Sequence, residues 1–189
     1  MRKGVLATAL FVCAACGGGG TGGPSGSASV NGNIGGQPMT ALDAVSNVFA
    51  SGSSSQGLLL VTNAANTCGM LSAGQQPRNA KAILIGIGSQ NGTSVSAPAA
   101  AGTYTVYTRA AIGGATGLVA VATYVATDGN CAQIAGIEAS SGTVTLTKID
   151  GNAYSGTFDI TFSDASHLTG TFGAIICAAL TTSVGGVCT

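Results

Sequence analysis

A Gly-Thr-apolar triplet near the C-terminus constrains the fold more than any other feature of this chain. It recurs at Gly142, Gly156 and Gly170, which are 14 residues apart each time. Each triplet opens a run in which apolar residues alternate with polar or small ones, the period of a half-buried β-strand. The runs 142–147, 156–162 and 170–174 therefore predict three successive strands. The alternation places one set of side chains on a common core face: Val144, Leu146, Phe158, Ile160, Phe162, Leu168 and Phe172.

Turn signals separate the three runs. Asp150-Gly151-Asn152 follows the first run, and an Asp-Gly pair readily adopts the positive φ angles of a tight hairpin. The segment 163–166, Ser-Asp-Ala-Ser, supplies the second turn. Three copies of so short a unit could also suggest a solenoid, but no matching period extends upstream. We therefore expect a C-terminal antiparallel meander of three strands.

Further strands are readable upstream, at 29–34, 44–50, 57–63, 80–88, 103–109 and 118–126. The runs 58–61 and 82–85 are apolar at every position, which predicts central strands covered on both faces. Gly86 and Gly88 indicate a bend or the close approach of another backbone. Only 66–73, and less clearly 132–139, leave room for a short helix, and 89–101 reads as the longest surface loop.

The pattern predicts an all-β fold for a single domain over residues 28–189, long enough to bury a core. We expect a single antiparallel sandwich or a partly closed barrel. Periodicity does not tell these two apart, because it does not reveal how the sheet edges meet.

The N-terminus carries an export pattern. Arg2 and Lys3 precede an apolar stretch over 5–12, and Ala14 and Ala15 precede Cys16. The stretch is too short to span a bilayer as a helix. Residues 1–15 resemble a bacterial lipoprotein signal peptide.

This resemblance implies cleavage before Cys16 and acylation of Cys16, including palmitate, so that the membrane partner is lipid. Ordinary secretion with cleavage nearby is the alternative. Residues 16–27 would then be the lipidated cysteine and a Gly/Ser-rich tether. Gly17, in place of the Asp associated with inner-membrane retention, favours the outer membrane, facing the periplasm or the surface.

Four further cysteines lie in the domain: Cys68, Cys131, Cys177 and Cys188. An even number in an exported chain predicts two disulfides, with three possible pairings. We prefer Cys177 with Cys188 across a short loop, which leaves Cys68 with Cys131. A metal site is the rival interpretation, but structural zinc sites bring cysteines in close pairs, so we expect no bound metal.

Charge and motifs exclude several function classes. Without the signal, the chain holds four cationic side chains against six carboxylates, a net charge of about −2, and no basic patch for nucleic acid. No catalytic or cofactor-binding motif is present, and no cofactor is expected. His167, with Asp164 near it in sequence, is the single candidate general base.

The sequence therefore predicts a lipid-anchored cell-envelope protein with a disulfide-stabilised β domain. We expect a noncatalytic binding or structural module of unknown specificity. The leading alternative is a carrier for a small apolar ligand, with a lipocalin-like barrel. A hydrolase that uses His167 is a more distant one.

Overall fold

The computed structural model describes residues 25–181 and 187–189, which form an all-β domain with very little helix. The strands of the main sheet are β1 (Ser27–Ile34), β2 (Gln37–Pro38), β3 (Asp43–Ser51), β4 (Ser54–Thr62), β6 (Lys81–Asn91), β7 (Ser94–Ser96), β8 (Gly102–Val106), β9 (Gly117–Thr127), β10 (Gln133–Asp150), β11 (Ala153–Phe162), β12 (His167–Gly173) and β13 (Ile175–Ile176). The remaining elements are α1 (Thr67–Ser72), β5 (Gln75–Gln76), the 3-10 turns η1 (Ile112–Gly114) and η2 (Ala178–Thr181), and β14 (Val187–Cys188).

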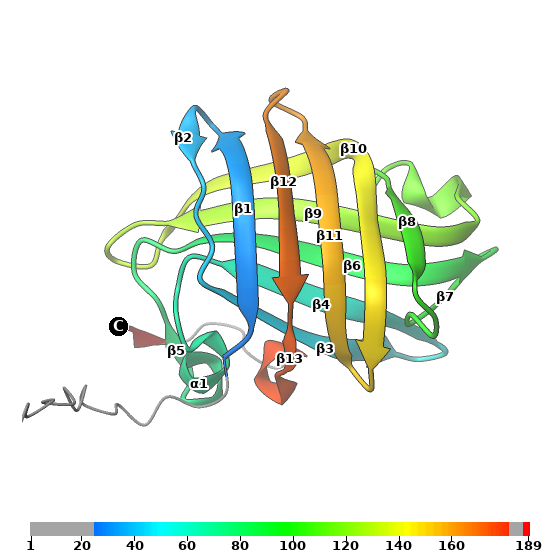
Figure 1. Ribbon diagram of the computed structural model, residues 1–189, viewed down its shortest axis with the longest axis horizontal. Helices are drawn as coiled ribbons and strands as arrows, with labels where there is room; N and C mark the ends of the chain where they lie inside the picture. The colour runs from blue at the N-terminus through cyan, green and yellow to red at the C-terminus, as the bar shows by residue number, and fades with distance from the viewer. Residues whose placement is uncertain (1–24, 182–186) are drawn as a thin grey trace, which may run out of the picture.

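Twelve of these strands make one continuous, curled sheet. Its order is β13-β3-β4-β6-β9-β8-β10-β11-β12-β1-β2, with β7 added beside β6. Figure 1 shows that β3, β4, β6 and β9 form one half, and that β1, β12, β11 and the end of β10 cross in front of them. The all-β prediction is confirmed, and the arrangement is a partly closed barrel made by one sheet folded over itself.

Strand β10 makes the fold-over possible because it belongs to both halves. Its first part, Gln133 to Glu138, pairs with β9, and its second part pairs with β8 and β11. A register shift between Ala139 and Ser141 marks the change of partner. Most ladders are antiparallel, as expected, but β8 with β9 and β13 with β3 run parallel, so the sheet is mixed. Strands β14 and β5 pair in parallel as a separate two-stranded sheet.

The predicted meander is present as β10, β11 and β12, and its expected core residues are all buried. All three triplet positions require glycine for the same physical reason. A Cβ atom on Gly156 would lie 1.9 Å from the Thr145 carbonyl oxygen, and one on Gly142 or Gly170 would lie 2.2 or 2.3 Å from a neighbouring carbonyl. Each glycine therefore permits a close approach of adjacent strand backbones.

The six upstream strands and the helix at 66–73 also form, within a few residues of their predicted bounds. The prediction of a second helix at 132–139 is wrong. This segment is the start of β10, where Ala135 and Ile137 pack against the core while the backbone pairs with β9. Long-range pairing overrides the local pattern here.

The space between the two halves is filled by side chains. Tyr104, Tyr154, Phe162, Ile83 and Ile160 are among the largest fully buried residues. Burial of such side chains contributes about 1.5–3 kcal/mol each to folding, before the entropy cost of ordering them.

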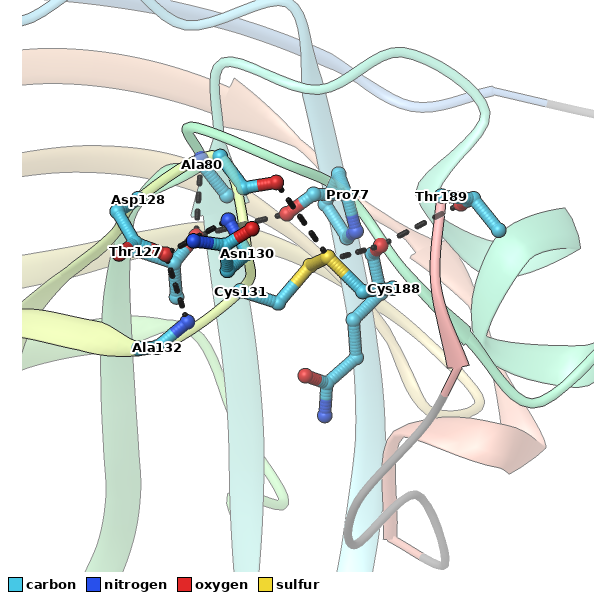
Figure 2. Close-up of a disulfide and its surroundings, with 11 residues drawn as sticks. Pro77, Ala80, Thr127, Asp128, Asn130, Cys131, Ala132, Cys188 and Thr189 are labelled. Atoms are coloured by element: carbon cyan, nitrogen blue, oxygen red, sulfur yellow. Dashed lines mark hydrogen bonds between the residues drawn. A yellow bond between two sulfur atoms is a disulfide. The ribbon is translucent and has the colours of Figure 1, made fainter.

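Both disulfides form, but the preferred pairing is wrong. Cys68 bonds to Cys177, and Cys131 bonds to Cys188, across sequence separations of 109 and 57 residues. The tail explains the difference, because β14 pairs with β5 and so carries Cys188 to the turn that holds Cys131. Figure 2 shows this bond beside Asp128, whose carboxylate accepts backbone hydrogen bonds from Asn130 at 2.8 Å and Ala132 at 2.9 Å.

The start of the domain is fixed by a buried carboxylate. Asp43 is 1% exposed, and it accepts hydrogen bonds from the backbone N–H of Gly26 at 2.7 Å and of Thr67 at 2.8 Å. Asp43 thus ties the segment that leads into β1 to the first residue of α1.

Candidate functional site

The outer face of β4, β6 and β9 carries apolar side chains that the fold does not fully cover. Leu58, Leu84 and Val121 point away from the core and are only half-buried, whereas their inward neighbours, such as Leu59 and Ile85, are fully buried. The expectation that β4 and β6 are central is confirmed, but their cover on the outer side is incomplete.

A hollow of about 390 Å³ lies on this face. Its floor includes Leu58, Gly86 and Val121. A Cβ atom on Gly86 would meet Val121 at 3.2 Å, so the missing side chain deepens the floor. The volume is within the range of small-molecule sites in proteins.

Two loop segments wall the hollow. On one side Val95 of β7 lies over Gly88, where a Cβ atom would be 2.6 Å from the Val95 side chain. The same Cβ atom would lie 2.9 Å from the Ser96 carbonyl oxygen, so the predicted close approach of another backbone is confirmed at Gly88, whereas only side chains approach Gly86. On the other side stand Arg109 and Ile112, from the segment between β8 and β9. The expected loop at 89–101 is in part a short hairpin, because β7 pairs with the end of β6.

Two polar groups in the hollow are free to make further interactions. The Arg109 guanidinium donates one hydrogen bond, to the Thr123 hydroxyl at 3.3 Å, and forms no salt bridge with any residue in 25–181 or 187–189. Gln90 is 6% exposed; its Nε2 donates to the Gly92 carbonyl at 3.2 Å, while its Oε1 is buried without a hydrogen-bond partner.

A second hollow, of about 400 Å³, continues from the first and shares Leu84 with it. Leu60, Leu71, Val125 and Leu180 line it. Cys131 also borders this hollow, and Cys68 in α1 is bonded to Cys177, the residue before η2. Both disulfides thus hold segments that form its walls.

The outer face of the other half of the sheet is polar. A row of hydroxyl residues crosses five strands as direct cross-strand neighbours: Thr103, Thr145, Thr157, Thr171 and Ser29. The hydroxyls of Ser29 and Thr171 lie 2.9 Å apart, and those of Thr103 and Thr145 lie 3.1 Å apart. Such contacts are typical of an exposed β-sheet surface.

His167 lies on this polar face. Its Nε2 is 2.7 Å from the carboxylate of Asp159, and both side chains are more than half exposed. Asp164, the expected neighbour, makes other contacts: hydrogen bonds from the Ser166 hydroxyl and backbone hold the pKa of Asp164 below its ordinary value. In the part of the chain that the structure covers, no hydroxyl group is hydrogen-bonded to His167.

Of the predicted site residues, Cys16 lies outside the described residues, and the four cysteines of the domain are all in disulfides. The hollow over Gly86 was not predicted. Its signal was present in the alternating Gly86 and Gly88 beside strands that are apolar on both faces. We expected that second apolar face to be buried beneath other segments of the fold.

No helix among the described residues is long and apolar enough to cross a membrane. Within the same residues, no three His, Cys, Asp or Glu side chains gather in a way that could hold a metal ion. The chain matches no protein-family model, no curated protein and no solved structure.

Proposed function

We propose that this chain is a lipoprotein of the bacterial cell envelope, anchored in the outer membrane through acyl chains on Cys16, and that its β domain is a noncatalytic binding module. The observation that carries the proposal is the pairing of all four domain cysteines in two disulfides. Such bonds persist in oxidising compartments, which agrees with the export pattern of residues 1–15.

The binding role is supported by the open apolar hollow over Gly86. Protein surfaces seldom leave contiguous apolar area uncovered unless it contacts something. A carrier of a small apolar ligand is the second candidate, and the same hollow favours it, although it lies on the outer face of the sheet and not within the barrel. The hydrolase alternative has less support, because His167 and Asp159 lie on an open face.

The anchor is tested with Cys16→Ser. The variant lacks the thiol that would receive lipid, so we expect it to move from the membrane fraction to the soluble fraction. Cys13→Ser is the matched control: it makes the same change three residues earlier, in the segment expected to be removed, and should leave the protein in the membrane fraction.

Intact mass of the native protein gives an independent readout. We expect a chain that starts at Cys16, carries diacylglyceryl and acyl groups, and gains four alkylated thiols only after reduction. A Cys16→Ser protein that remained acylated and membrane-bound would refute the anchor.

A further inference from the structure

We infer that the hollow over Gly86 binds an elongated amphiphile with an apolar body, an anionic group at one end and a hydrogen-bond donor toward the other. This inference deepens the proposed function: it rests on the binding role of the β domain and not on the lipid anchor. Three features of the hollow each select one part of the ligand.

The apolar body is selected by the floor. Leu58, Leu84 and Val121 surround the bare backbone of Gly86, and all three are half-buried. An apolar chain lying over Gly86 would remove their remaining surface from water, which favours binding.

The anionic group is selected by Arg109. Its guanidinium stands at the wall and donates a hydrogen bond to the uncharged Thr123 hydroxyl. The nearby Glu138 carboxylate accepts a hydrogen bond from the Arg109 backbone N–H, not from the guanidinium. Arg binds carboxylates through two parallel N–H donors, and such charge-assisted bonds are stronger than neutral ones. The domain has more carboxylates than cations, yet none in the described segments is paired with this side chain.

The donor is selected by Gln90. Its Oε1 can only accept a hydrogen bond, and it is buried without one, a state that costs free energy unless a partner arrives. A ligand hydroxyl or amide N–H that reached this oxygen would satisfy it.

The two polar groups fix the ligand's length and direction. Thr123, the partner of Arg109, pairs with Leu84 of β6, and Gln90 is the last-but-one residue of the same strand. The backbone of β6 spans roughly 20 Å between these positions. A medium-length chain with a carboxylate at one end and a hydroxyl at the other matches this layout.

Binding is tested by calorimetry on the full chain carrying Cys16→Ser, so that no acyl chain competes for the hollow. The probes are ω-hydroxydecanoate, decanoate and decanediol. We expect ω-hydroxydecanoate to bind about tenfold more tightly than decanoate, which lacks the hydroxyl, or decanediol, which lacks the anionic group. Amide NMR shifts should be largest at Gly86 and Gly88.

Variants separate the three features. Arg109→Gln should weaken both acids about tenfold and leave decanediol unchanged, and Gln90→Leu should reduce ω-hydroxydecanoate to the affinity of decanoate. Arg78→Gln, the same change at an arginine outside the hollow, is the control and should change nothing. Gly86→Ala, which adds one methyl group to the floor, should weaken all three probes.

Three results would overturn the inference: no binding of any probe up to millimolar concentration, equal effects of Arg109→Gln and Arg78→Gln, or shifts that avoid Gly86. Failure of this test leaves membrane anchoring through Cys16 untouched, and loss of the anchor would leave probe binding untouched, so the two failures are distinguishable.

Discussion

Two buried tyrosines of the core differ in one hydrogen bond. The Tyr104 hydroxyl donates to the Ala100 carbonyl at 3.0 Å, whereas the Tyr154 hydroxyl is buried with no partner. Burial raises the pKa of both side chains, and the neighbouring Tyr104 adds to the rise at Tyr154. The two rings are therefore equally buried, but only the Tyr104 hydroxyl has a hydrogen-bond partner.

Removal of each hydroxyl should have opposite effects on stability. Tyr154→Phe removes an unsatisfied polar group, so we expect the free energy of unfolding to rise by up to about 1 kcal/mol. Tyr104→Phe removes a made hydrogen bond and leaves the Ala100 carbonyl without this donor, so we expect a loss of about 1 kcal/mol. Urea denaturation of both variants measures the difference, and a loss at Tyr154 as large as that at Tyr104 would contradict this account.

Single residues of the hollow could not be assigned from the sequence. Arg109 was one of four cations in the domain, and nothing near it in sequence indicates that it stands beside Thr123. Gln90 lay in a segment that reads as the start of a loop, and its burial follows from the hairpin of β6 and β7. Both placements depend on tertiary contacts, which periodicity does not report.

The glycine triplet was the most reliable guide to the position of individual strands. It predicted β10, β11 and β12 because each of these hairpin-linked strands needs a glycine, and the three glycines recur at the same spacing. The structure adds the reason, which is the contact between each glycine and a neighbouring backbone. The segment 132–139 was misread because its residues have no strict alternation, and a register shift near Gln133 and Ala135 accounts for that irregularity.

Gly156→Ala tests the role of the triplet. Its new Cβ atom would overlap the Thr145 carbonyl, so β10 and β11 would have to separate, and we expect a loss of about 3 kcal/mol. Gly113→Ala is the control, since a Cβ atom there meets nothing within 4 Å and should change stability by less than about 1 kcal/mol. Thermal unfolding of the two variants measures the difference. Equal midpoint temperatures would contradict the role of Gly156 in the close approach of β10 and β11.

For the domain as a whole, the sequence predicts the all-β class but leaves the choice between sandwich and barrel open. That choice depends on β10, which leaves one half of the sheet and enters the other at Ala139. The disulfide pairing was misjudged for a similar reason. Sequence proximity favoured Cys177 with Cys188, whereas the parallel pairing of β14 with β5 carries Cys188 away.

The two disulfides should contribute unequally to global stability. Each removes chain entropy from the unfolded state, by an amount that grows with loop length. We expect loss of either bond, by paired Cys→Ala changes, to cost about 4 kcal/mol. Loss of Cys68–Cys177 should cost about 0.6 kcal/mol more than loss of Cys131–Cys188, because the separations are 109 and 57 residues.

Equilibrium unfolding in urea compares the two double variants. A non-reducing digest of the native protein should first yield the two cross-linked peptide pairs. Peptides that join Cys177 to Cys188 would contradict the connectivity, and a larger loss for Cys131–Cys188 would contradict the loop-length argument.

The hydrogen bond from Gly26 to Asp43 has a mechanical consequence for a chain tethered at Cys16. Tension on the tether would reach the domain at Gly26 and run along the axis of β1, which pairs with β12 at seven positions from Ser27 to Asn33. A pull in that direction loads the whole ladder in shear, so its hydrogen bonds resist together and do not open one by one. The domain would then withstand drag from a bound partner at its tethered end through seven backbone pairs, whereas the C-terminal strand, with only two pairs, is held by the Cys131–Cys188 bond.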